Sequence, residues 1–236
     1  MIPVMIERLP VSHIDITVLN DILTQEKAAR VPGMEDDEFF SSQQVLRDFQ
    51  VDPEEITSGL VSQSANDIKG SDGGIDAMYI FYNGRLLRDM EQAEALKSAK
   101  QNIILDVIII QASRQSGFDL NRILRIKDAS ENIFGVDRDT NQFSEKYNEP
   151  LLDSINRFRA VHRAIITKKA EIQVSYFYVT NGDSTKLSPD VDAKARELEK
   201  AIPKTLATVK SCTFTFVGAR DLIDLYCQGR SKTRAC

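Results

Sequence analysis

Two short segments of the chain carry the side chains best suited to catalysis or metal binding. The first, GSDGGIDAMYIF at residues 70–81, is a glycine-rich turn that leads Asp76 into an apolar run. The second, DVIIIQASRQSGF at residues 106–118, is an apolar run that ends in Gln111 and Ser113, which share one face if the run is a strand. On neighbouring strands Asp76 and Gln111 would converge. A carboxylate and an amide oxygen can hold a hard cation, which would polarise a phosphodiester and activate water.

The sequence contains few of the histidines and cysteines that other kinds of catalytic site need. The chain has two histidines, His13 and His162, which are far apart, and three cysteines without a CxxC pair. This excludes a Cys/His zinc site of the usual spacing and leaves little for a Ser-His-Asp or Cys-His triad. Metal chemistry would therefore have to use oxygen ligands, which favours Mg²⁺ or Mn²⁺.

Composition indicates a folded protein without a membrane segment. Of the 236 residues, 42% are hydrophobic, enough for a core, and no apolar run approaches the roughly 18 residues of a spanning helix. The N-terminal apolar stretch is too short for a signal peptide, so we expect a soluble cytoplasmic protein. The net charge of −5 means that nucleic acid could be bound only through local basic patches.

The elements that must position these side chains follow from the hydrophobic pattern. A strand over residues 75–82 is closed by Asn83-Gly84, a strong hairpin signal, and the β-branched run 103–112 indicates a central strand buried on both faces. Further strands are expected at 171–180 and 212–217, and helices at 14–30, 35–49, from Leu120, at 149–168, from Pro189 and at 219–226, with an irregular stretch at 128–147. This alternation predicts an α/β fold with a mixed sheet covered on both faces.

The pattern G-x-D-G-G-I-D, followed by a hydrophobic strand that ends in I-I-Q, resembles the AIPR family of abortive phage infection proteins. The resemblance covers most of the chain from about residue 35 and includes the Asn-Gly turn at 83–84, Tyr147-Asn148-Glu149, Val179-Thr180-Asn181-Gly182, and Phe216-Val217-Gly218 leading into Asp221-Leu222-Ile223. It implies a restriction-endonuclease-like, or PD-(D/E)xK, α/β domain over residues 35–236. An N-terminal helical extension would occupy residues 1–34, and the whole would be the N-terminal portion of a longer protein.

The resemblance also implies roles for individual residues. Asp76 matches the motif aspartate that binds the metal, and Gln111 matches the position held by Glu, Asp or Gln, so both are expected to be catalytic residues and ligands of Mg²⁺ or Mn²⁺. Asp72 matches the acidic residue of the preceding turn. The motif lysine falls on Ser113, which is expected to replace it as the third catalytic residue. This is a departure from the motif, because a serine hydroxyl does not supply the positive charge that the lysine provides.

Four other residues are candidates for supporting the site. Arg114 is adjacent to Ser113 but is expected to point to the opposite face of its strand. Arg122 and Arg125 are spaced to share one face of the following helix and could reach in to replace the missing charge. Glu38 is the candidate for the helical acidic residue that often completes such sites.

Three functions stay open at this point. The first is a metal-dependent nuclease of phage defence that hydrolyses DNA or RNA. The second is a catalytically degenerate nuclease fold that binds or senses nucleic acid or a protein partner, which the serine at position 113 and the acidic net charge both favour. The third is a homodimerisation domain that uses the long helix with His162 at the interface. Gln111 also has an ordinary interpretation as a hydrogen-bonded residue at a strand end, and His162 as a packed histidine.

The long helix expected at 149–168 has a basic character. Arg157, Arg159 and Arg163 fall on both sides of its apolar stripe. Such charges are usually a solvated face, which is our interpretation here, and phosphate contact is the alternative.

Overall fold

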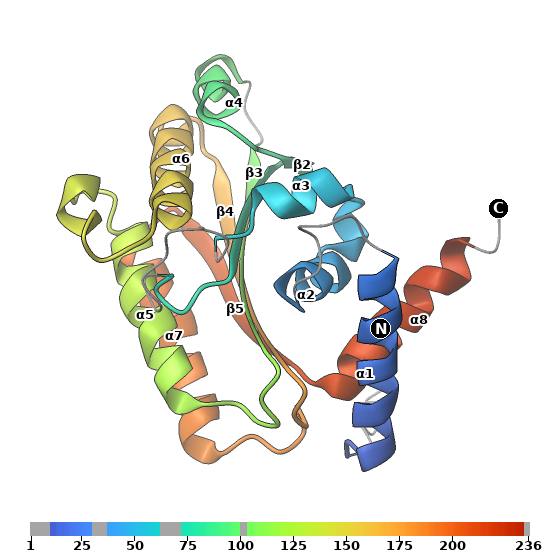
Figure 1. Ribbon diagram of the computed structural model, residues 1–236. Helices are drawn as coiled ribbons and strands as arrows, with labels where there is room; N and C mark the ends of the chain where they lie inside the picture. Colours follow the sequence, from blue (N-terminus) through green and yellow to red (C-terminus); the bar gives the residue numbers. More distant parts are fainter. Residues whose placement is uncertain (1–9, 30–36, 62–71, 100–102, 234–236) are drawn as a thin grey trace, which may run out of the picture.

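The structure, a computed structural model, describes residues 10–29, 37–61, 72–99 and 103–233. Its centre is a sheet of five strands in the order β2-β1-β3-β4-β5 (Figure 1). The strands are β1 (Ala77–Tyr82), β2 (Arg85–Leu86), β3 (Ile104–Ser113), β4 (Glu171–Thr180) and β5 (Val209–Val217). β1 runs antiparallel to β2 and β3, whereas β3, β4 and β5 are parallel. The predicted α/β class with a mixed sheet is therefore confirmed.

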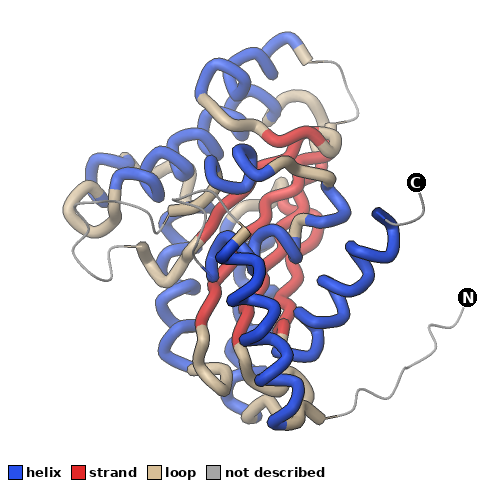
Figure 2. Tube along the Cα trace, turned by 45° about the vertical axis from the view of Figure 1, so that its right-hand side comes forward, coloured by secondary structure: helices blue, strands red, loops and turns tan. Residues whose placement is uncertain are grey.

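Helices cover both faces of this sheet (Figures 1 and 2). One layer contains α4 (Met90–Ala95), α5 (Leu120–Phe134), α6 (Glu149–Ile165) and α7 (Pro189–Thr205). The other contains α1 (His13–Ala28), α2 (Asp37–Val45), α3 (Pro53–Ser58) and α8 (Ala219–Thr233). Short 3₁₀ turns lie at Arg47–Phe49, Leu96–Ser98 and Thr140–Phe143.

The run expected to form a central strand is buried on both faces, as β3. Val107 and Ile109 pack into the core beneath α5, α6 and α7, while Ile108 and Ile110 pack into the core beneath α2. The Asn83-Gly84 hairpin is also present. Both residues have positive φ, 48° and 77°, as a tight turn of this kind requires.

Several element boundaries differ from the expected ones: α2 ends at Val45 rather than 49, and α6 ends at Ile165 rather than 168. α5 continues to Phe134, into the stretch expected to be irregular, because Ile126, Ala129 and Ile133 continue its buried face at helical spacing. β5 begins at Val209, three residues earlier than expected, and α8 extends to Thr233 rather than 226.

The first helix packs into the same core as the elements that follow it. Leu19 and Leu23 of α1 are buried with Leu222 of α8, and the Tyr226 hydroxyl donates to Glu26 Oε1 at 2.6 Å. The expected boundary between residues 34 and 35 lies outside the described residues. Among the described residues, no helix combines the length and the apolar character needed to cross a membrane.

Candidate functional site

Asp76 is held by the backbone at the point where β1 begins. Its N–H donates to the Ile110 carbonyl of β3 at 2.9 Å, and its own carbonyl accepts from the Val61 N–H at 2.9 Å. The antiparallel register pairs Ala77 with Ile110, so Asp76 lies opposite Gln111. The start of β1 and the end of β3 thus meet at the edge of the sheet where the parallel strands terminate, which we call the carboxyl edge.

The side chains of Asp76 and Gln111 are in direct contact. Gln111 Nε2 donates to Asp76 Oδ2 at 2.5 Å, and the Ala112 N–H donates to the same oxygen at 2.6 Å. The two side chains are nearly sealed from solvent, since Asp76 is 7% exposed and Gln111 is 1% exposed. The convergence expected from strand alternation is therefore present, but in a buried setting.

This setting raises the proton affinity of Asp76. Burial, which disfavours the charged form, is the main reason that the pKa of Asp76 rises from 3.8 to about 7. The hydrogen bond from Ala112 and the positive charge of Arg122 lower this pKa, whereas the negative charges of Glu38 and Asp72 raise it further. Glu38, Asp72 and Arg122, three of the candidate supporting residues, therefore act electrostatically on Asp76.

Asp72 organises the glycine-rich turn that delivers Asp76. Its Oδ1 accepts from the Gly74 N–H at 2.7 Å and from Arg125 Nη2 at 2.9 Å. Gly74 has φ of +76°, and a Cβ there would lie 3.0 Å from the Arg125 Cβ. The turn therefore needs glycine to approach α5, and Arg125 is an ion-pair partner of this turn rather than a free cation.

Arg114 and Ser113 do not supply the positive charge that the motif lysine would provide. Arg114 points away from Gln111, as expected, and forms a two-pronged ion pair with Asp37 of α2, with Nη2 at 2.6 Å from Oδ1. Ser113 is half-buried, and its Oγ accepts from the Gln115 N–H at 3.3 Å. Of the basic candidates, Arg122 is the one whose charge favours ionised Asp76.

Sequence reasoning missed an aromatic group beside the site. Tyr178 of β4 pairs in register with Gln111, and its hydroxyl accepts from the Asp119 N–H at 3.0 Å. Phe118 packs edge-on against the rings of Tyr178 and Phe216, with centroid distances of 5.2 and 5.0 Å. Strand register was the signal that could have placed Tyr178 next to Gln111.

The donor set as it lies does not fit a shared Mg²⁺ or Mn²⁺ ion. Gln111 Nε2 also donates to the Ala112 carbonyl at 2.8 Å, and because a carbonyl only accepts, the amide presents nitrogen rather than oxygen to Asp76. Within the part of the chain that the structure describes, no three His, Cys, Asp or Glu side chains form a group that could hold a metal ion. For Asp76 and Gln111 to share a cation, the Gln111 amide would have to flip so that its oxygen, rather than its nitrogen, faces Asp76.

Comparison with protein-family models, with curated proteins and with solved structures gives no match for this chain. The resemblance of its two motif segments to the AIPR family therefore stays a prediction from the motifs. The contact between Asp76 and Gln111 does not depend on this resemblance.

Proposed function

We propose that this chain is a restriction-endonuclease-like domain, of the abortive-infection kind, that binds nucleic acid at the carboxyl edge of its sheet in the cytoplasm. The observation that carries the proposal is the contact between Asp76 and Gln111. These are the two positions at which the motifs place the family's site, and they meet where open α/β sheets commonly bind ligands.

A binding role is favoured over catalysis by the burial of the two motif residues. Gln111 is 1% exposed and donates to Asp76, so the pair joins β1 to β3 instead of facing a substrate. Groups that solvent can reach at this edge include the polar loop 114–117, Lys186 and Arg125, which is paired with Asp72, and Arg122 is half-buried. Arginines near the first turn of a helix are suited to phosphate, because the helix N-terminus adds positive potential.

Removing both arginines of α5 tests this proposal. We expect the Arg122→Ala, Arg125→Ala double variant to bind nucleic acid about tenfold more weakly and to reduce the slope of log affinity against log salt by roughly 1–2. The measurement is fluorescence anisotropy with labelled single-stranded and double-stranded DNA and RNA, over a series of salt concentrations. The same series shows which of these nucleic acids is preferred.

A matched control removes two arginines from the opposite end of β1. Arg85 and Arg88 are exposed and lie away from the carboxyl edge, so the Arg85→Ala, Arg88→Ala variant changes the net charge equally. Its affinity should stay close to that of the wild type. Equal losses in the two double variants would contradict a site at the carboxyl edge, as would the absence of binding to every nucleic acid at low salt.

Metal-dependent phosphodiester hydrolysis is the second candidate, and one observation favours it. Burial, and then the negative charges of Glu38 and Asp72, raise the pKa of Asp76, and a bound cation would offset these effects. If hydrolysis occurs with Mg²⁺ or Mn²⁺, the Asp76→Asn variant should lose it. A lysine at position 113 would stabilise the negative charge that develops on the phosphate in the transition state. Ser113→Lys should therefore raise the rate of hydrolysis about 10²-fold. Equal rates in the wild type and Asp76→Asn would remove Asp76 from any such reaction.

A further inference from the structure

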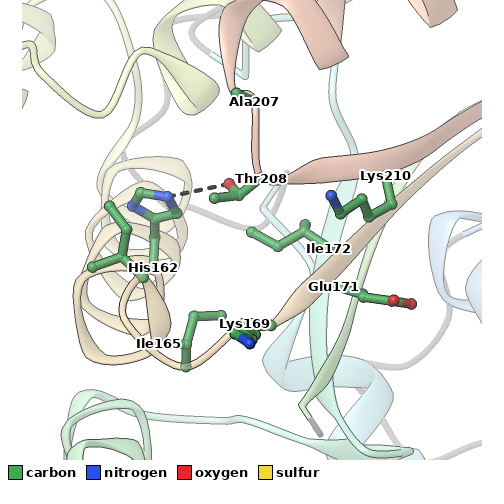
Figure 3. A pocket seen from close by; sticks show the side chains of 10 residues that line it. His162, Ile165, Lys169, Glu171, Ile172, Ala207, Thr208 and Lys210 are labelled. Atoms are coloured by element: carbon green, nitrogen blue, oxygen red, sulfur yellow. Dashed lines mark hydrogen bonds between the residues drawn. The ribbon is translucent and has the colours of Figure 1, made fainter. Parts of the chain in front are cut away.

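A hollow of about 420 Å³ lies at the opposite edge of the sheet from Asp76, where β4 and β5 begin (Figure 3). It is bounded by the last turn of α6, the turn that leads into β4, and the turn that joins α7 to β5. None of the residues assigned to the carboxyl edge lines it. Whatever this hollow binds is therefore separate from the proposed nucleic-acid site.

A histidine and a threonine form one wall of the hollow. His162 is 3% exposed, which confirms the interpretation as a packed histidine, and its Nε2 lies 3.3 Å from Thr208 Oγ1 (Figure 3). Burial and the neighbouring Arg163 lower the pKa of His162, so the ring is neutral at pH 7. In the tautomer that carries its proton on Nε2, the ring donates to Thr208 and leaves the threonine hydroxyl free to donate to a ligand.

Two lysines stand at the opening of the hollow. Lys169 and Lys210 are exposed, and neither forms an ion pair with any residue that the structure describes. Figure 3 shows Lys210 extending toward Ile172 and Thr208, whereas the Glu171 carboxylate extends away from the hollow. Lys210 thus faces the space and Lys169 lines it, whereas the carboxylate of Glu171 on the same rim points away.

The charge balance limits the kind of ligand that fits. α6 and α7 both end at this hollow, and the C-terminus of a helix carries roughly half a negative charge. Without the Glu171 carboxylate, which extends away from the hollow, the two lysines exceed these helix ends by roughly one positive charge. Ile166, which is 56% exposed, and the half-buried Ala170 also line the hollow and supply apolar surface that a ligand can reach, whereas Ile165 and Ile172 are sealed beneath it. The site therefore suits one negative charge joined to an apolar body.

We propose that this hollow binds a small organic monocarboxylate, with its carboxylate between Lys169, Lys210 and the Thr208 hydroxyl and its apolar body against Ile166 and Ala170. Binding selects the tautomer of His162 that donates to Thr208, because the hydroxyl proton is then directed to the carboxylate. The site is a ligand-binding site and involves no covalent step.

Histidine-selective NMR on the full chain tests this proposal directly. The chain has only two histidines, so the ring signals of His162 report on the hollow and those of the exposed His13 are an internal reference. We expect hexanoate to shift the His162 signals saturably at about 10 mM or below and to fix the proton on Nε2. Acetate, which lacks the apolar body, and hexanamide, which lacks the charge, should each bind at least about tenfold more weakly.

Paired variants separate a specific site from general attraction to positive charge. The Lys169→Ala, Lys210→Ala variant should weaken hexanoate binding about tenfold, while Lys200→Ala, Lys204→Ala, which removes two exposed lysines of α7 outside the hollow, should not. Ring signals of the unliganded variants that match the wild type show that the fold is kept. A hexanoate response that is absent, that is shared equally by His13, or that is lost equally in both variants would overturn the proposal.

Discussion

Replacing Asp76 with asparagine is expected to remove a large pH dependence from the stability of this protein. The pKa of Asp76 is about 7 in the folded chain and 3.8 without the protein's influence, so between these values the folded state holds a proton that the unfolded state releases. The free energy of unfolding therefore falls as pH rises from 4 to 7, by about 1.4 kcal/mol per unit and about 4 kcal/mol in total. Asparagine keeps an oxygen that accepts from Gln111 and Ala112 but carries no charge.

The measurement is urea unfolding of both proteins at a series of pH values from 4 to 8. The stability of Asp76→Asn relative to the wild type should increase by about 4 kcal/mol over this range. Asp128→Asn is the control, because it removes the same charge from an exposed carboxylate and should give a profile parallel to that of the wild type. Parallel profiles for Asp76→Asn would mean that Asp76 is already ionised in the folded protein.

Arg159 of α6 should be among the most important single side chains for stability. It is 4% exposed, and its guanidinium donates to the carbonyls of Asn132, Gly135 and Arg138, the first two at 2.8 and 2.9 Å. These carbonyls lie at the end of α5 and in the turn that follows. Because Arg159→Met keeps the apolar stem but removes the charged donors, we expect it to lower the free energy of unfolding by about 3–5 kcal/mol.

A neighbouring arginine provides the comparison for this prediction. Arg163 lies one turn further along α6 and is exposed, so Arg163→Met should change stability by no more than about 0.5 kcal/mol. Thermal and urea unfolding compare the two variants, and hydrogen exchange should show faster exchange at residues 132–138 in Arg159→Met. Similar stability of the two variants would mean that water replaces the guanidinium without cost.

The arginine pair also shows a limit of interpretation from the sequence. The basic residues of the long helix indicated a solvated face, and Arg163 agrees with this. Arg159, in contrast, satisfies carbonyls within the fold, and Arg157 Nη1 donates to the carbonyls of Leu87 and Arg88. Helical spacing fixes the direction in which a side chain leaves its helix, but the backbone groups that meet it come from α5 and from the segment after β2, which only folding brings near.

For the candidate site, the sequence predicted the two strands and the polar residues at their ends. The hairpin at Asn83-Gly84 is local and pairs β1 with β2, whereas the pairing of β1 with β3, which sets Asp76 opposite Gln111, joins segments that are distant in sequence. Only the tertiary structure therefore decided that these two residues meet, and how they meet. The nitrogen that Gln111 presents, and the proton affinity of Asp76, depend on burial and on charges from α2, α5 and the glycine-rich turn, which are distant in sequence and act on Asp76 only after the layers have packed.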